Sequence, residues 1–560
     1  GKGAKKSMKK RIKLILPITL AFFLAACGGS AETAETKAAD SQKTEKAAVE
    51  TTVSEPEEDV SYPDLDTPFN TYMEARFSED GKTAYLPLDN GECLQIEESE
   101  PITFAVATPD RKHVIVLLSS DELYETDIRL KKKKVISDNC SSSRVYPSNE
   151  GMCFQATVDK EPHLMRYTFE DENLVELGAC SVYGLSGGGM AAVAVSDGDL
   201  CLLPADSDEL IRYPGLGVDN MKIKALPDDG STVIWTETTD KSLTEKLYTL
   251  GADGTAQLLG DITVRGLVFV NYSKDSKLAL VTSEYVSHLY IRDISGQWHR
   301  VELPDGLKNE AYVYETDAGL LHQVNADEIH YLYVRCGNEL CAVSPDGTIT
   351  TIQKSVRDFD IIDGTLYYSD TGKNIYSASL NGAEVSESTL LLSGMDAFAV
   401  TQDGQYLYGM YVHEDDNKVR SLSVYPLHEE NAAEIMLDEN IYADSHVYLS
   451  AESSAAFYVT GAQKVADSYY YAGTLMVYHP ETGETKTIDT DVYKDTFMNG
   501  KDYVIVSEYA QSTAGIGKFV SFHGDLMYRK KPADNTDGDR FDWYFYDGSE
   551  PVLMVADLDY

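Results

Sequence analysis

The sequence lacks three features that would each have indicated a particular kind of protein. No C-x-x-C pair occurs among its 8 Cys, so zinc-finger and thioredoxin-like sites are excluded. No apolar run reaches the roughly 20 residues that a membrane-spanning helix needs. Beyond Thr71 there is almost no helical periodicity of apolar residues. These absences argue against an α-helical body and against a body held together by metal.

Basic residues are scarce relative to acidic ones, with 48 Lys and Arg against 92 Asp and Glu. The formal net charge of −44 becomes −51 when residues 1–26 are removed, because that segment carries seven basic groups and no acid. So acidic a surface repels nucleic acid and anionic lipid headgroups, and neither is expected as a partner. A surplus of acids also keeps an exposed protein soluble.

The first 26 residues have the organisation of an export signal. A basic stretch, residues 9–13, precedes an apolar segment, residues 14–24, that only Pro17 and Thr19 interrupt. The apolar segment is too short to span a bilayer but has the length of a signal-peptide core. We therefore predict that residues 1–26 are a signal peptide.

The signal ends in Leu24-Ala25-Ala26-Cys27, which resembles a bacterial lipobox. The resemblance implies that a signal peptidase recognises Leu24, Ala25 and Ala26, and that the chain is cut before Cys27. It also implies that the Cys27 thiol carries a diacylglyceryl group. The expected location is then the extracytoplasmic side of the cell membrane, with the lipid as the anchor. The alternative is an ordinary secretory signal with an incidental cysteine.

Residues 28–60 contain no aromatic residue and consist mainly of Ala, Glu, Thr, Ser and Lys. Such a composition cannot bury enough apolar surface to offset the entropy of ordering the backbone. We therefore predict that residues 27–60 comprise the lipidated cysteine and a disordered tether, which spans at most about 110 Å when extended.

From Thr71 onward the pattern predicts short strands separated by turns, an all-β body. Its 37 Tyr, against 16 Phe, suit a half-buried pleated surface because the ring packs while the hydroxyl reaches water. Four strands are predicted at 103–106, 113–118, 122–126 and 134–136. Four antiparallel strands within about 40 residues make one β-propeller blade.

The same unit recurs along the body. Turns rich in Asp and Gly separate the first and second strands at 78–82, 108–111, 226–230, 273–277 and 401–405. Third-to-fourth-strand hairpins recur at 247–254, 340–347, 375–382 and 475–483. We count about ten or eleven modules between residues 70 and 557, more than the roughly four to eight blades of an ordinary ring. Two consecutive propellers, 61–305 and 306–560, are therefore predicted, and one large irregular propeller is the alternative.

The turn-and-strand pattern resembles the Pro-Asp-Gly repeats of TolB-like propellers, and the whole chain is similar to propeller lipoproteins of Gram-positive gut bacteria. The complete Ser-Pro-Asp-Gly motif stands only at 344–347, in a different hairpin of the blade. The resemblance implies fold and compartment. It implies no catalytic residue, because these repeats serve structure.

Several short motifs resemble functional sites but are interpreted as structural. Residues 184–188 match the G-x-S-x-G nucleophile elbow, but an apolar strand follows where the elbow needs a helix, so Ser186 is predicted to lie in a turn. Residues 535–539 resemble part of a calcium loop whose two strongest ligands are missing. Residues 293–298 approach the Asp-box turn of sialidases and predict a hairpin turn, and Lys131–Lys134 a solvated tip.

The remaining composition predicts no cofactor, no metal site and no catalytic residue. Quinone-dependent propellers use a Trp in every blade, whereas this chain has 3 Trp, and its 11 His show no metal-ligand spacing. Apart from Cys27, seven cysteines remain, an odd number that does not make a disulfide framework. Cys336 and Cys341 flank a Gly337-Asn338 turn in diagonal positions, and whether they form a bridge stays open.

Two functions of different class follow. The first is a membrane-anchored binding or scaffold module for a protein, a peptide or a cell-envelope glycan, docked on a face of the propeller. The alternative is a carbohydrate-active, glycosidase-like enzyme that uses carboxylates from several blades around the central channel. Whether the chain is an enzyme stays open, with the binding module favoured. A lipoprotein that acts in envelope assembly without a small ligand is a third possibility.

Overall fold

The computed structural model describes residues 73–559, except 79, 88–92, 217–220, 239–243, 252, 264–267, 284–287, 305–312, 315–324, 414–417, 430–431, 443–444, 451–452, 466–469, 495–502, 509–514, 520–525, 531–539 and 547. Contacts divide the chain into two units, Gly1–Ser61 and Tyr62–Tyr560, and every described residue belongs to the second. In the described ranges, no helix combines the length and the apolar character needed to cross a membrane.

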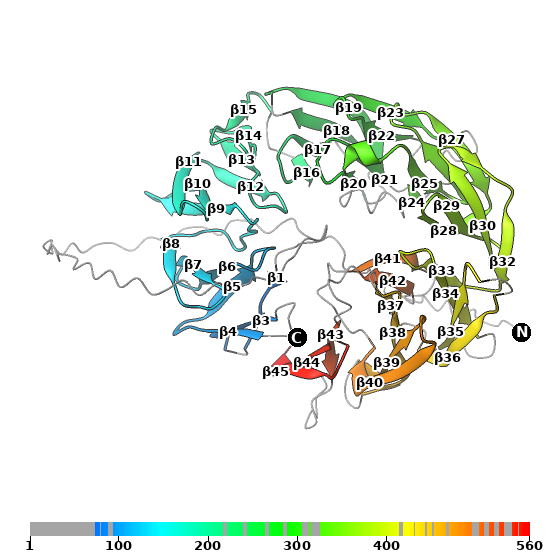
Figure 1. Ribbon diagram of the computed structural model, residues 1–560. Coiled ribbons are helices and arrows are strands. Elements are labelled where there is room, and N and C mark those ends of the chain that lie inside the picture. Colours follow the sequence, from blue (N-terminus) through cyan, green and yellow to red (C-terminus); the bar gives the residue numbers. More distant parts are fainter. Residues whose placement is uncertain are drawn as a thin grey trace, which may run out of the picture. The chain divides into compact units, whose positions relative to one another are not determined.

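The described residues form a succession of small antiparallel sheets, here called modules, that follow one another in chain order (Figure 1). The first six modules are β2 (Arg76–Phe77), β3 (Thr83–Pro87), β4 (Cys93–Glu97); β5 (Ile102–Ala107), β6 (His113–Leu118), β7 (Leu123–Asp127), β8 (Lys134–Ser137), with β1 (Met73–Glu74) paired to β5; β9 (Gly151–Val158), β10 (Glu161–Thr168), β11 (Asn173–Ala179); β12 (Ser181–Leu185), β13 (Ala192–Ser196), β14 (Asp199–Leu203), β15 (Ile211–Tyr213); β16 (Met221–Ala225), β17 (Thr232–Thr238), β18 (Thr244–Gly251), β19 (Ala256–Thr263); and β20 (Val268–Tyr272), β21 (Ala279–Ser283), β22 (His288–Arg292), β23 (Trp298–Glu302).

The later modules keep the same order of strands. They are β24 (Val313–Tyr314), β25 (Leu332–Cys336), β26 (Glu339–Val343), β27 (Ile349–Lys354), with the short 3-10 helix η2 (Ala326–Glu328) between β24 and β25; β28 (Val356–Ile362), β29 (Thr365–Asp370), β30 (Asn374–Asn381), β31 (Glu384–Val385), β32 (Thr389–Ser393); β33 (Ala397–Val400), β34 (Tyr406–Val412), β35 (Val419–Pro426), β36 (Ile435–Tyr442); β37 (Val447–Leu449), β38 (Ala456–Lys464), β39 (Tyr471–His479), β40 (Glu484–Tyr493); and β43 (Leu526–Lys530), β44 (Arg540–Tyr546), β45 (Val552–Asp559). A hairpin, β41 (Tyr503–Glu508) and β42 (Gly515–Phe519), stands between the last two.

Burial along a module explains its sequence pattern. The second strand, such as β6 with the sequence HVIVLL, is buried over almost its whole length because neighbouring strands and modules cover it. The fourth strand, such as β40 with ETKTIDTDVY, is largely exposed and therefore carries Glu, Thr, Lys and Asp. Charged residues on these outer strands protect an edge that would otherwise pair with other chains.

The turn between the first two strands is built by two side chains. In the second module, Thr108 Oγ1 donates to Asp110 Oδ1 (2.7 Å), which also accepts from the Lys112 amide (3.1 Å). The His113 amide donates to Thr108 Oγ1 (3.1 Å), and Arg111 takes a positive φ of 59°. Such side chains replace backbone partners in a tight turn. The same bonds recur in the pairs Ser78 with Asp80, Ser273 with Asp275 and Thr401 with Asp403.

Each module shares an apolar core with the next. The core between the second and third modules contains Ile115, Phe154 and Tyr167. The core between the sixth and seventh contains Leu289 and Leu332, so apolar packing crosses the boundary at 305/306. The expected division into propellers at that boundary stays a prediction, and this packing favours the alternative of one larger propeller.

The first and last modules also pack together. One core unites Leu86 of β3 and Val116 of β6 with Phe545 of β44. In addition, the guanidinium of Arg76 lies 5.6 Å from the ring centroid of Trp543. Among the described residues, eight separate sheets and a ninth made of three successive meanders give eleven modules, within the expected number. The described body is a β-propeller-like fold.

Candidate functional site

The four residues predicted to direct lipidation, Leu24, Ala25, Ala26 and Cys27, lie outside the described residues, as does the tether. The acidic segment 535–539, interpreted as a solvated loop, also lies outside them. The lipid site therefore stays a prediction from the sequence.

Ser186 of the G-x-S-x-G motif lies in the turn between β12 and β13, as predicted. Its side chain is buried, and its Oγ accepts a hydrogen bond from the Ala191 amide at 3.2 Å. The residue thus has the structural role that Thr108 and Ser273 have in their own modules. A strand follows it instead of a helix, so the motif is a turn and not a nucleophile elbow.

Glycines in this turn serve close packing between modules. Gly189 has φ +72°, and a Cβ at this position would stand 1.6 Å from the Tyr146 carbonyl oxygen. The Gly189 carbonyl accepts from the Cys153 amide at 2.6 Å, and the Gly188 amide donates to the Asp228 carboxylate of the next module. Glycine is required here because both the backbone angle and the contact exclude a side chain.

The Asp-box-like segment is a hairpin turn between β22 and β23, as predicted. Asp293 Oδ1 accepts from the amides of Ser295 (2.8 Å) and Gln297 (3.0 Å), and Oδ2 bonds His299 Nε2 at 2.6 Å. Burial alone would raise the pKa of Asp293, but these hydrogen bonds lower it to about 2. The carboxylate is thus held charged by the turn that it closes.

Lys131–Lys134 form a largely exposed tip, as predicted, but three of the four lysines also make ion pairs. Lys133 pairs with Glu98 (3.0 Å), and its ammonium lies 3.9 Å from the ring centroid of Tyr124. Lys132 and Lys134 both pair with Glu172, at 2.9 and 2.8 Å. These contacts join three successive modules. Local sequence could not predict them because the acids lie more than thirty residues away.

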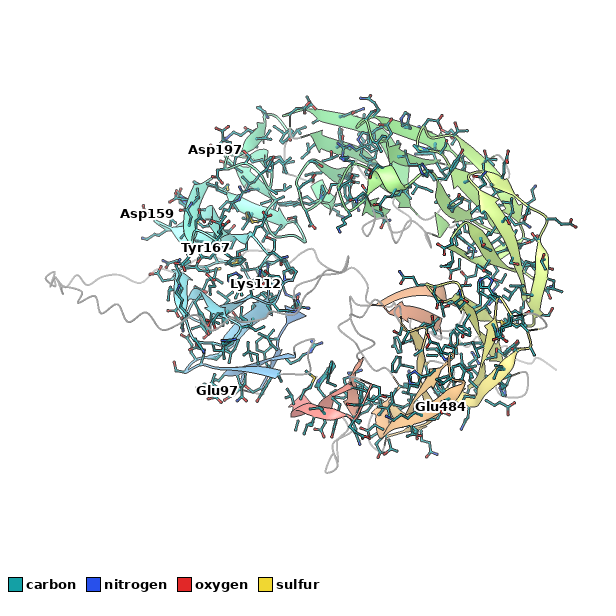
Figure 2. The ribbon with its side chains drawn as sticks, viewed as in Figure 1. Glu97, Lys112, Asp159, Tyr167, Asp197 and Glu484 are labelled. Carbon is teal, nitrogen blue, oxygen red and sulfur yellow. The ribbon has the colours of Figure 1, made fainter. Side chains whose placement is uncertain are left out.

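Tyrosine hydroxyls make further bonds between modules. Tyr167, labelled in Figure 2, donates to Glu125 Oε2 of the preceding module at 2.6 Å. Glu125 Oε1 also bonds His113 Nδ1 at 2.7 Å, and the His113 ring stacks on Phe169 with centroids 4.4 Å apart. Burial alone would raise the pKa of Glu125, but the bonds from His113 and Tyr167 lower it. The three polar groups satisfy one another and form a structural bridge.

The same arrangement occurs near the end of the chain. Tyr528 donates to Asp489 Oδ2 at 2.8 Å, and Lys530 Nζ lies 2.6 Å from Asp489 Oδ1. Elsewhere the hydroxyl donates to a backbone carbonyl of the adjacent module, as Tyr272 does to Thr232 (2.9 Å) and Tyr333 to Gly382 (3.1 Å). The tyrosine content that predicted strands therefore also serves to connect them.

The β41–β42 hairpin departs from the repeat. β42 pairs in parallel with β37, with Val447 opposite Ile516 and Leu449 opposite Lys518, whereas the other pairings between described strands are antiparallel. β42 also contacts β33, and β41 contacts β28 and β33. Figure 1 shows the hairpin, in orange, beside β33 and β37. The hairpin thus adds a strand to the first strand of one module and lies against the first strands of two others.

The candidate binding site is formed by the edges of the first strands β28 and β33, next to the edge of β37 that β42 already occupies. No local pattern could predict a parallel pairing between strands almost seventy residues apart, since pairing is decided by tertiary contacts. Among the described residues, no group of three or more His, Cys, Asp or Glu is placed to hold a metal ion.

No protein-family model matches the sequence, and no curated protein does. Among solved structures, the chain is similar to tricorn protease, with a TM-score of 0.27 and 13% identity over 87% of this chain and 47% of that chain. It therefore spans about half of the tricorn protease chain. It is also similar to a eukaryotic initiation factor, with a TM-score of 0.31 and 11% identity over 66% of this chain and 97% of that chain. A third similarity is to dihydro-heme d1 dehydrogenase, with a TM-score of 0.25 and 12% identity over 68% and 76%.

Proposed function

We propose that this chain is an extracytoplasmic binding module, held at the membrane by a lipid on Cys27, that takes up an extended polypeptide at the edges of its first strands. The compartment is supported by the export signal and by the lipobox-like sequence Leu24-Ala25-Ala26-Cys27. The acidic body disfavours nucleic acid as a partner.

The bonds of the polar side chains described above favour the interpretation that these side chains form a rigid frame, and not that they form a reactive site. Glu125 and Asp489 each accept bonds from a neighbouring Tyr and a basic group, and Asp293 closes a turn. Carboxylates used in this way hold modules together, and a rigid frame suits the presentation of edges and loops. The glycosidase-like alternative needs two carboxyls roughly 5 to 9.5 Å apart that face a sugar. No observation on the described residues favours that alternative.

The parallel pairing of β42 with β37 is the observation that carries the proposal. It means that a first strand of this fold accepts an added strand through its backbone, from a segment far away in the chain. Strand addition to a sheet edge is a common mode of peptide recognition, in which backbone hydrogen bonds provide affinity. β33 and β28, which the hairpin contacts, are first strands of the same kind.

The test measures the thermal unfolding of the purified chain with a panel of unstructured peptides and, separately, with cell-wall oligosaccharides. A ligand in large excess over its Kd raises Tm. We expect extended peptides to raise Tm and to slow amide hydrogen exchange in β28 and β33. Matched peptides with Pro at alternate positions should do neither, because Pro cannot complete a strand ladder.

Three outcomes would contradict the proposal. A shift of Tm by oligosaccharides alone would assign the site to a glycan. Hydrolysis of such an oligosaccharide would favour the enzyme. Equal effects of the peptides and their Pro-containing controls would exclude strand addition.

A further inference from the structure

Two cysteines of the seventh module occupy diagonal positions of one hairpin. Cys336 ends β25 and lies opposite Glu339, while Cys341 of β26 lies opposite Val334. The two-residue loop between the strands begins at Gly337, with φ 60°. Because side chains alternate between the faces of a strand, Cys336 and Val334 share a face, and Cys341 shares it with them. The sequence predicted this diagonal arrangement, and the register confirms it.

The two side chains are buried in the same apolar core. Cys336 and Cys341 are both 0% exposed and pack with Val334 and Val343. Cys341 Sγ lies 3.8 Å from Thr351 Oγ1. Interaction with the Cys336 thiol and with Thr351 lowers the pKa of Cys341 although burial opposes it. Interaction with the Cys341 thiol, and then burial, raise the pKa of Cys336.

We propose that Cys336 and Cys341 form a disulfide when the chain folds in the presence of a disulfide oxidant. Diagonal residues of an antiparallel pair are separated by about 7 to 8 Å, with their Cβ atoms somewhat closer. A disulfide usually spans Cα separations of about 4.4 to 6.8 Å, and the register places both cysteines on one face of the hairpin. The bridge therefore requires the two strands to move closer together at this diagonal.

The reaction is thiol–disulfide exchange. The Cys341 thiolate attacks a small-molecule disulfide, such as oxidised glutathione, and displaces one thiolate. The Cys336 thiolate then attacks Cys341 Sγ and displaces the second. The pair loses two electrons and two protons, and the oxidant leaves as two thiols. Both sulfurs are inaccessible in the folded core, so the exchange takes place before the hairpin packs.

The other described cysteines are the internal controls. Each has its sulfur near a backbone carbonyl oxygen, such as Cys153 near Met190 (3.3 Å) and Cys180 near Gly178 (3.5 Å). The sulfur also lies near a backbone carbonyl oxygen in the remaining three, Cys93, Cys140 and Cys201. All seven described cysteines, Cys336 and Cys341 included, are free thiols in the structure, and we expect these five to remain thiols after oxidative refolding.

The full chain is unfolded, reduced and refolded in a buffer of reduced and oxidised glutathione. Thiols are then blocked under denaturing conditions with iodoacetamide, and disulfides are reduced and labelled with N-ethylmaleimide. Trypsin cuts after Arg335 and Lys354, so one peptide contains both Cys336 and Cys341. We expect both cysteines to carry the maleimide. When the reduction is omitted, this peptide should be unlabelled and two hydrogens lighter than the same peptide with two free thiols. The control cysteines should carry the first reagent.

A chain that regains its folded circular dichroism with Cys336 and Cys341 both blocked by iodoacetamide would overturn the proposal. A bridge from either cysteine to a third one would overturn it as well. In the variant Cys336→Ser, Cys341 should become accessible to the first reagent. Refolding with a defined oxidant makes the result independent of where the cell places the protein and of what it binds.

Discussion

The hydroxyl of Tyr408, in β34, donates a hydrogen bond to the backbone carbonyl of Ser454 at 2.8 Å. Ser454 lies in the turn between β37 and β38, so the bond joins two successive modules. Both residues are buried. A buried carbonyl without a hydrogen-bond partner is costly. The Tyr408 hydroxyl therefore stabilises this junction, because apolar packing alone would leave the Ser454 carbonyl without a donor.

We expect Tyr408→Phe to lower the stability of the protein by about 1 to 3 kcal/mol, since it leaves the Ser454 carbonyl buried without its donor. The measurement is the midpoint of thermal unfolding. Tyr406→Phe on the same strand is the matched control, because no hydrogen bond of its hydroxyl occurs among the described residues. Equal midpoints for the two variants would show that the Tyr408 bond contributes nothing.

Arg166 is buried between the third and fourth modules and binds four oxygens. Its guanidinium donates to the carbonyls of Ser207 (2.6 Å), Met190 (2.9 Å) and Pro204 (2.7 Å), and to Asp208 Oδ1 (3.0 Å). Arg166→Met keeps much of the apolar volume but removes every donor. We expect a loss of about 2 kcal/mol or more, because hydrogen bonds to charged groups are the strong ones.

The matched control for this variant is Arg212→Met in the fourth module. Arg212 is largely exposed and bonds Asp197 (3.3 Å) and Ser196 (2.8 Å). An exposed pair contributes about 0 to 1 kcal/mol. Urea titration followed by tryptophan fluorescence and circular dichroism measures both variants. If Arg212→Met destabilises the chain as much as Arg166→Met does, burial of the guanidinium does not explain the loss of stability.

The Asp293 turn predicts a dependence of stability on pH. The pKa of Asp293 is lowered from its usual 3.8 to about 2, so its charged form stabilises the folded state. That contribution is fully present above pH 3.8 and is lost as the pH falls toward 2. Asp293→Asn should therefore unfold at a lower temperature than the unmodified chain at pH 6, and the difference should shrink below pH 3.8. A difference in Tm that stays constant from pH 6 to pH 2 would contradict this account.

The lipid anchor predicts where the protein is found in the cell. Cys27→Ala removes the sulfur that the lipobox resemblance assigns to the diacylglyceryl group, so the variant should move from the membrane fraction to the soluble fraction. Cys93→Ala, which leaves the signal intact, should remain with the membrane. Detection with an antibody after fractionation measures both. Retention of Cys27→Ala on the membrane would mean that another part of the chain is the anchor.

The strands and turns were predictable because their rules are local. The second strand of the second module was predicted at 113–118, and the structure gives β6 as His113–Leu118. Apolar alternation and the Asp and Gly residues of tight turns act over a few neighbouring positions. For the same reason Ser186 could be assigned to a turn, and Cys336 and Cys341 to diagonal positions, before any contact was known.

The partners across modules could not be predicted. Lys133 and Glu98 carry no signal that they pair, and nothing in residues 503–519 indicates β37 as a partner. Each bond depends on how whole sheets pack, which involves residues about forty or more positions apart in several cases. Local composition is the same whether such a residue is exposed or bonded to the next module.

The sequence by itself determined the all-β body, the repeated four-strand unit and its turns, because alternation, burial and backbone angles depend on adjacent residues. It also carries the predicted export signal and lipid site. Only the tertiary structure decided which polar groups join the modules, and that β42 adds to β37 in parallel. Those choices follow from the packing of one sheet against the next, where a hydroxyl or carboxylate must find a partner once water has been excluded.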